Sequence, residues 1–225
     1  MPVVLASSKT LVELQALRRR LELAHPVICE NGAFIDVPQG YFSAAMPVRE
    51  PPPAREQLQV VYREVKAAGQ FRCRAFFELG VTGIVAATGL DAAAAARANE
   101  RQATEPVLWE DSPQAYERFC AAVEAQGLRC LRGGRFVHVM GDADKASAML
   151  DLLDAYRQVP PPPTSIALGD GPNDVAMLAA ADIAVIVRGH HAHRIELEDH
   201  PYVLRTQEYG PLGWHNAIRQ LLNIQ

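Results

Sequence analysis

The spacing of hydrophobic residues changes along the chain in a way that predicts alternating strands and helices. Val3–Ala6 is a continuous apolar run, and the leucines that follow it, up to Leu21, recur at helical spacing. Short apolar runs return at 164–168 and 183–187, and an amphipathic segment at 214–222 closes the chain. Strands that alternate with helices are typical of an α/β fold, so we expect an α/β protein.

A turn signal and a run of prolines divide the first half of the chain. Glu30-Asn31-Gly32 separates two short apolar runs, 26–29 and 33–37, which predicts a hairpin. The composition then changes at Pro47 and Pro51–Pro53, which indicates the entry into a second module. In that module we expect helices near 54–68, 91–101 and 112–126 and strands near 71–76, 106–109 and 128–132.

The chain is expected to return to its first module after this insertion. Gly133–Val139 predicts a glycine-hinged strand, and a helix follows from Asp144-Lys145. We therefore predict a core domain made of residues 1–46 and 135–225, with an α+β domain of residues 47–134 inserted into it.

Composition and charge narrow the classes of partner. The formal net charge of −4 gives no basic field for nucleic acid, and no apolar stretch approaches the ~20 residues of a membrane span. The apolar start, Pro2–Ala6, is far shorter than a signal-peptide core, so we expect a cytoplasmic protein. The four cysteines include no Cys-x-x-Cys pair, which favours reduced packing residues over a zinc site or a disulfide framework.

The segment 167–178 carries the strongest chemical signal. It runs from an apolar strand into a helix through Gly169 and Gly171, which permit a tight turn with unusual φ/ψ. Ligands of open α/β sheets bind beyond the carboxyl ends of strands, and two carboxylates with an amide suit Mg²⁺. The alternative is an ordinary polar turn. The candidate residues are Asp170, Asn173 and Asp174.

Two other helix starts carry groups that suit an anion. Thr10 and Glu13 fit a capping box, which leaves Ser7 and Ser8 at a helix N-terminus and predicts a phosphate cradle. The alternative is that these serines only cap the helix. Lys145 at a helix start opposes the helix dipole unless an anion lies there, and a solvated lysine is the alternative.

The chain resembles the haloacid dehalogenase superfamily of Mg²⁺-dependent phosphatases. The resemblance lies in the order of three features: a strand followed by a serine, a later lysine, and the motif Gly-Asp-Gly-x-Asn-Asp. Further motifs resemble the mannosyl-3-phosphoglycerate phosphatase family within it. The resemblance implies a Rossmann-like core, an inserted α+β cap and dephosphorylation of mannosyl-3-phosphoglycerate to mannosylglycerate. The motifs are Ser7–Thr10, Glu30–Ala33, Arg101 with Glu105-Pro106, Gly133–Phe136 through Asp144-Lys145, and Gly210–Trp214.

The resemblance also implies catalytic roles for individual residues. Ser7 and Asn173 would bind the phosphate and Lys145 would neutralise it, while Asp170 and Asp174 would hold or orient Mg²⁺. The physical chemistry agrees with these roles. A phosphate dianion is repelled by carboxylates unless a metal ion and a lysine stand between them, and phosphoryl transfer depends mainly on such charge neutralisation.

Four further residues are candidates for binding a phosphorylated small-molecule substrate. Ser8 and Lys9 belong to the serine turn. Arg101 belongs to a motif within the inserted domain, and Arg135 belongs to the motif where the chain leaves that domain. A guanidinium pairs bidentately with carboxylate or phosphate, so either arginine suits an anionic substrate. The alternative for each arginine is a surface ion pair.

The superfamily's first motif, a strand ending in Asp-x-Asp that supplies the nucleophile, is missing ahead of the serine strand. The only Asp-x-Asp, Asp142–Asp144, lies beside Lys145. The resemblance places the missing strand centrally, so its absence would leave a gap of ~9.6 Å or force the flanking strands to pair anew. We expect a start site assigned too late. The rivals are an inactive binding remnant and a phosphatase for another phosphorylated sugar or glycerate.

Overall fold

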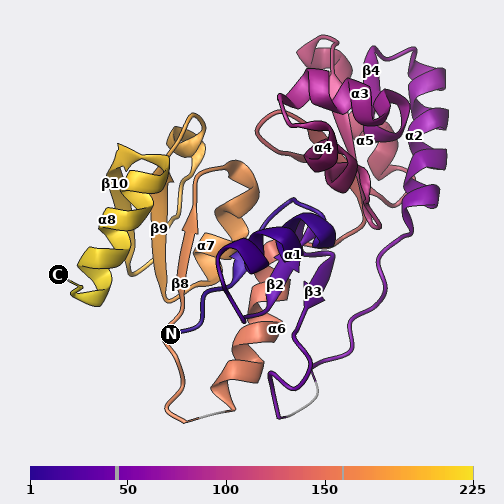
Figure 1. Cartoon of the computed structure of the whole chain (residues 1–225). Coiled ribbons are helices and arrows are strands. Elements are labelled where there is room, and N and C mark those ends of the chain that lie inside the picture. Colours follow the sequence, from indigo (N-terminus) through magenta and orange to yellow (C-terminus); the bar gives the residue numbers. More distant parts are fainter. Residues whose placement is uncertain (44–45, 159, 225) are drawn as a thin grey trace. The chain divides into compact units, whose positions relative to one another are not determined.

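The computed structural model describes residues 1–43, 46–158 and 160–224. Its contacts divide the chain into two compact units: unit 1 holds residues 1–41 and 48–144, and unit 2 holds residues 42–47 and 145–225. Both units combine helices with β-sheets, which confirms the expected α/β class (Figure 1). Over the described ranges, none of the helices is both long and apolar enough to cross a membrane.

Unit 1 begins with a small sheet that carries the serine turn. Its strands are ordered β1-β2-β3, with β1 parallel to β2 and β2 antiparallel to β3. Leu14, Val27 and Cys29 form the buried core, and the predicted hairpin is confirmed. The elements are β1 (Leu5–Ala6), α1 (Leu11–Arg20), β2 (Val27–Cys29), the 3₁₀ turn η1 (Glu30–Gly32) and β3 (Phe34–Asp36).

The rest of unit 1 is an antiparallel sheet of order β4-β5-β7-β6 with four helices. Aromatic side chains of α2 and α5, chiefly Tyr62 and Phe119, fill the core against this sheet. The three helices predicted for the insert are confirmed. The elements are α2 (Arg55–Gly69), β4 (Cys73–Ala75), α3 (Phe76–Thr88), α4 (Ala92–Asn99), β5 (Thr104–Trp109), α5 (Pro113–Glu124), β6 (Arg129–Arg132) and β7 (Val137–Met140).

Two elements of this sheet differ from the sequence-based expectation. Helix α3 was not predicted, because Gly80 interrupts it with a left-handed φ of 58° and masks its period. Strand β7, expected to return to the core, pairs with both β5 and β6 and so extends the sheet of the insert to Met140. Its short apolar pattern fits either sheet equally well. The contact boundary falls after Asp144 instead of at residue 135, and the predicted domain limits stay a prediction.

Unit 2 is built on a parallel sheet of order β10-β9-β8. The strands predicted at 164–168 and 183–187 are confirmed as β8 and β9, and α8 packs on β9 and β10 (Figure 1). Edge strand β10 was missed because polar residues interrupt its sequence. The elements are α6 (Lys145–Arg157), β8 (Ile166–Gly169), η2 (Pro172–Asp174), α7 (Val175–Ala180), β9 (Ile183–Arg188), η3 (Ala192–Arg194), β10 (Val203–Tyr209) and α8 (Gly210–Leu222).

The strands expected to flank the missing motif belong to different sheets. β1 stands at the edge of the sheet β1-β2-β3, and β8 stands at the edge of the sheet β10-β9-β8. Each pairs in parallel with its inner neighbour, with Leu5 opposite Val27 and Ala167 opposite Ala184. Of the two expected outcomes, a gap or a new pairing of the flanking strands, the described residues show no pairing between β1 and β8.

Candidate phosphate and metal site

The centre of the candidate site in unit 2 is a buried ion pair at the start of α6. Lys145 Nζ donates to Asp174 Oδ1 over 2.6 Å, and the two side chains are 5% and 10% exposed. Lys145 was expected to need an anion at this helix start, and Asp174 supplies one from within the fold. The alternative of a solvated lysine is wrong.

The second carboxylate oxygen of Asp174 organises the turn after β8. Asp174 Oδ2 accepts the backbone N–H groups of Asp170 at 3.2 Å and Gly171 at 3.3 Å. A Cβ added to Gly169 would lie 2.5 Å from the Cβ of Asp174, so only glycine fits there. Gly169 is therefore needed for this close approach, whereas a Cβ on Gly171 would lie 2.8 Å from Oδ1 of the flexible Asn173 side chain; neither glycine has a positive φ.

Asp170 and Asn173 complete this turn in unit 2. Asp170 is exposed, and its carboxylate has no hydrogen-bond or ion-pair partner among the described residues. The carboxylate lies against the chain after β9, because a Cβ added to Gly189 would be 2.8 Å from Asp170 Oδ2. Asn173 is half-buried beside Gly171. The structure therefore gathers Lys145 with the three predicted residues of the turn at the carboxyl end of β8.

The serine turn of unit 1 has the helix start that the sequence predicted. Thr10 Oγ1 accepts the N–H of Glu13 at 3.2 Å, and the Glu13 carboxylate accepts the N–H of Thr10 at 2.9 Å, which confirms the capping box. Ser7 Oγ accepts the N–H of Lys9 at 3.2 Å. Thr10 therefore caps α1, and the half-buried Ser7 and Ser8 lie in the turn before it.

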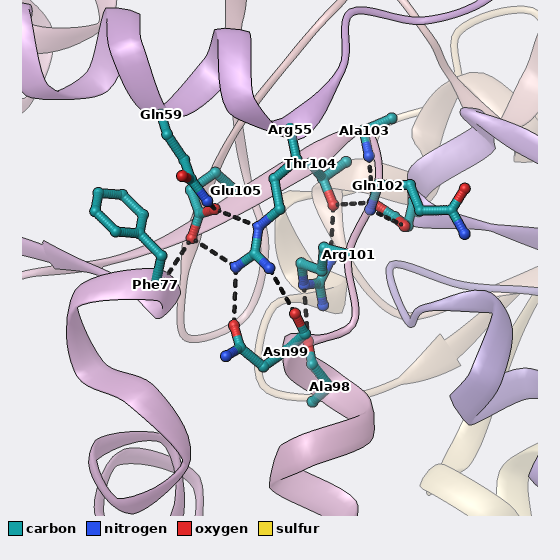
Figure 2. Close-up of polar contacts among 11 residues, drawn as sticks. Arg55, Gln59, Phe77, Ala98, Asn99, Arg101, Gln102, Ala103, Thr104 and Glu105 are labelled. Carbon is teal, nitrogen blue, oxygen red and sulfur yellow. Dashed lines mark hydrogen bonds and ion pairs between the residues drawn. The ribbon is translucent and has the colours of Figure 1, made fainter.

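Arg101 ties the serine turn to α4 and β5, and Figure 2 shows it beside Ala98 and Thr104. Its Nη1 donates to the carbonyl of Ser8 at 3.0 Å and to Thr104 Oγ1 at 2.7 Å, and its Nε donates to the carbonyl of Ala98 at 3.1 Å. Burial lowers the pKa of the Arg101 guanidinium, and the charge of Glu30 partly offsets this. Arg101 thus anchors the backbone of unit 1, and its substrate-binding role stays a prediction.

Arg135 and Lys9 lie in more open positions. Arg135 is exposed, and its Nη1 donates to the carbonyl of Thr88 at 2.8 Å. Lys9 is exposed and pairs with Glu13 at 3.0 Å. Neither side chain is committed to a buried network, so both retain donors for a ligand.

Sequence and structure comparisons place the chain among known phosphatases. No family model matches it. The chain is 33% identical over 233 residues to a glucosyl-3-phosphoglycerate/mannosyl-3-phosphoglycerate phosphatase of Methanococcoides burtonii, an alignment that covers 98% of this chain and 85% of the relative. The chain belongs to this phosphatase family. It is therefore a phosphatase by family, as the sequence motifs implied.

Solved structures agree on the fold of this phosphatase. One is a phosphatase of the haloalkanoate (HAD) enzyme superfamily from Bacteroides thetaiotaomicron, with a TM-score of 0.64, 18% identity and coverage of 100% of this chain and 83% of that one. Another is a haloacid dehalogenase-like hydrolase from B. subtilis, with a TM-score of 0.64, 16% identity and coverage of 100% and 88%. At this identity the likeness shows a shared fold.

Sequence reasoning missed a buried polar network in unit 1 of the phosphatase. Glu105 is fully buried and accepts hydrogen bonds from Arg55 Nε at 2.7 Å, Gln59 Nε2 at 3.3 Å and the N–H of Phe77 at 3.2 Å (Figure 2). Arg55 also donates to the carbonyl of Asn99 at 2.6 Å. The adjacent Glu-Pro pair was noticed only as a family motif, because its partners are 28 to 50 residues away in the sequence.

Glu30 forms a second buried cluster that sequence reasoning did not assign. Its carboxylate accepts the N–H groups of Gln102 at 2.9 Å and Ala103 at 3.1 Å, and the hydroxyl of Thr104 at 2.7 Å. Glu30 is 1% exposed, so these three donors satisfy a carboxylate that would otherwise be costly to bury. The hairpin turn after β2 is thereby fixed to the start of β5.

Proposed function

We propose that this phosphatase is Mg²⁺-dependent and removes the phosphate from mannosyl-3-phosphoglycerate to give mannosylglycerate. The observation that carries the proposal is the relative of 33% identity, whose name gives phosphorylated glycosylglycerates as its substrates. The lysine, carboxylate and amide groups at the carboxyl end of β8 support it, because they suit a phosphate and a hard cation.

The residues at the end of β8 fit a magnesium ion. Mg²⁺ commonly takes one or two protein carboxylates and completes its shell with water and phosphate oxygens. Asp170 offers an exposed carboxylate, and Asp174 lies four residues on in the same turn. Asp170 would hold the ion directly, and Asp174 would orient the site through Lys145 and the turn amides. The ion would supply positive charge against the phosphate.

The protein groups of the site have separable tasks in this proposal. Lys145 neutralises one phosphate oxygen while its pair with Asp174 keeps the ammonium group in place. Asn173 donates an amide hydrogen to the phosphate, and the role of Ser7, in unit 1, as a phosphate ligand stays a prediction. Such preorganised donors act without reorganisation during the reaction, which is the main source of rate enhancement in phosphoryl transfer.

The substrate panel that tests the proposal is mannosyl-3-phosphoglycerate, glucosyl-3-phosphoglycerate, 3-phosphoglycerate and mannose 6-phosphate, each titrated calorimetrically with and without Mg²⁺. We expect the tightest binding for mannosyl-3-phosphoglycerate, and we expect EDTA to weaken it. Equal affinity for all four compounds would contradict the proposed preference for mannosyl-3-phosphoglycerate. An affinity for mannosyl-3-phosphoglycerate that is the same with and without EDTA would contradict the proposed Mg²⁺ dependence.

A second candidate function, binding of the substrate without turnover, is favoured by one observation. The only Asp-x-Asp in residues 1–225 begins with Asp142, whose side chain is fully exposed and 3.9 Å from Arg129. This carboxylate follows β7 in the sheet of the insert, not a parallel strand. A phosphate-release assay on the 225-residue chain separates the two: release supports the phosphatase, and tight binding without release supports the second candidate.

A further inference from the structure

Asn31 has a side chain that the fold buries without providing a partner. The residue is 1% exposed, and neither Oδ1 nor Nδ2 has a hydrogen-bond partner among the residues that the structure describes. A buried carboxamide can make several hydrogen bonds, and leaving all of them unmade is unfavourable. An unsatisfied group of this kind therefore indicates a polar partner that binds from outside the chain.

The backbone around Asn31 is held against the serine turn by hydrogen bonds. Glu30 and Asn31 both have left-handed φ values, 48° and 58°. The N–H of Glu30 donates to the carbonyl of Lys9 at 2.9 Å, and the N–H of Asn31 donates to the carbonyl of Ser7 at 3.0 Å. The buried Glu30 carboxylate is bound in turn by the start of β5. These contacts fix the backbone position of Asn31 beside the serine turn.

The strand register places that carboxamide at the same edge as the serine turn. β1 and β2 are parallel, with Ala6 opposite Ile28, so Ser7 and the turn at Asn31 both follow carboxyl ends of neighbouring strands. Ligands of α/β folds bind beyond such ends. Ser7 is partly exposed and its carbonyl accepts the N–H of Asn31 at 3.0 Å, so an anion that reaches Ser7 lies next to the turn at Asn31.

We propose that the Asn31 carboxamide is a phosphate-contacting group that acts beside Ser7. The inference rests on the proposed function, since it assigns a further ligand to the same anion. Nδ2 donates a hydrogen bond to a phosphate oxygen, and Oδ1 accepts one from a hydroxyl group. A turn residue alone would not require this side chain, because glycine adopts the same left-handed backbone without a buried amide.

The test compares two substitutions at Asn31 by calorimetric titration of inorganic phosphate in the presence of Mg²⁺. Asn31→Gly removes the carboxamide and keeps the left-handed backbone, so phosphate should bind about 10-fold more weakly. Asn31→Asp keeps the shape but adds a negative charge, so it should weaken phosphate binding more than Asn31→Gly does. Urea unfolding of each variant reports whether the fold is retained.

Asn223 supplies the matched control. It also has a left-handed φ, 51°, but it is the exposed C-cap of α8. Asn223→Gly and Asn223→Asp should leave the phosphate affinity unchanged. Wild-type phosphate affinity in both Asn31 variants, with a changed unfolding midpoint, would show a purely structural residue and overturn the inference.

A Lys145→Met variant separates failure of this inference from failure of the proposed function. If Lys145→Met loses phosphate while both Asn31 variants keep wild-type affinity, the anion site stands and only the role of Asn31 is overturned. If the wild-type chain binds no phosphate, the proposed anion site and the role of Asn31 are overturned together. Weaker binding in all three variants, with Asn223 variants unaffected, supports both.

Discussion

Lys145 and Asp174 form an almost fully buried ion pair whose Nζ and Oδ1 atoms are 2.6 Å apart. The pair joins the first residue of α6 to the turn that follows β8. Because Asp174 also accepts two backbone N–H groups, its charge is satisfied on both oxygens. The same contacts that organise the proposed phosphate site therefore also hold the fold of unit 2.

The first prediction follows from removing one member of this pair. Lys145→Met leaves the Asp174 carboxylate buried without its counter-charge, so the free energy of unfolding should fall by about 3 kcal/mol. The double variant Lys145→Met/Asp174→Asn should recover a large part of this loss, which a double-mutant cycle in urea measures. Additive losses would show that the two side chains do not interact.

The second prediction separates the metal ligand from the fold. Asp170 is exposed, so Asp170→Asn should leave the free energy of unfolding within about 0.5 kcal/mol of wild type. It should nevertheless abolish the calorimetric response to Mg²⁺, because a neutral amide is a far poorer ligand than a carboxylate. Asp142→Asn, at another exposed aspartate, is the control and should keep that response. An unchanged Mg²⁺ titration of Asp170→Asn would refute the assignment.

The third prediction concerns Arg101 as an anchor of unit 1. Lysine keeps the charge but cannot reproduce the contacts that the guanidinium makes with Ser8, Thr104 and Ala98. Arg101→Lys should therefore lower the free energy of unfolding by about 2 kcal/mol.

The matched substitution for Arg101→Lys is Arg135→Lys. Arg135 is exposed, and its Nη1 donates to the carbonyl of Thr88 at 2.8 Å, so its replacement should change stability little. Titration of both variants with 3-phosphoglycerate shows whether either guanidinium also binds substrate. Equal stability of the two lysine variants would contradict the anchoring role of Arg101.

The sequence predicted the features that depend on neighbouring residues. The capping box of Thr10 and Glu13 spans three residues, and the β8 turn lies within the continuous segment 167–178. Both could therefore be predicted from the spacing of residues that are close in the sequence. The position of Lys145 at a helix start predicted a nearby anion, but its partner Asp174 lies 29 residues away in the sequence and no local spacing identifies it.

Features that depend on distant residues could not be predicted in this way. The three residues that donate hydrogen bonds to Glu30 follow it by 72 to 74 residues in the sequence, and no local pattern predicts such a cluster. The unpartnered state of Asn31 is a property of the packed interior, whereas its sequence context indicated only a tight turn. Strand β7 was assigned to the other sheet because three apolar residues and a histidine do not specify a partner strand.

The last prediction concerns pH and the junction between β8 and β9. Asp182 Oδ2 accepts the N–H and the hydroxyl of Ser165, each at 2.7 Å, and the N–H of Asp182 donates to Ser165 Oγ at 2.9 Å. These hydrogen bonds hold the pKa of the Asp182 carboxyl below its ordinary value. The bond from the Ser165 N–H has the larger effect and the bond from the Ser165 hydroxyl the smaller.

A lowered pKa in the folded state means that the ionised form of Asp182 stabilises the fold. This contribution is complete above the unfolded pKa of about 3.9 and is lost as the pH falls through the lower folded value. Asp182→Asn should therefore lower the free energy of unfolding at pH 7, by no more than about 1 kcal/mol because the side chain is exposed. The difference from wild type should shrink as urea unfolding is repeated at pH 4, 3 and 2, since protonated Asp182 resembles the amide. Asp142→Asn, without hydrogen bonds to Ser165, provides the reference series. A difference between wild type and Asp182→Asn that stays constant down to pH 2 would show that the carboxylate charge plays no part in joining these two strands.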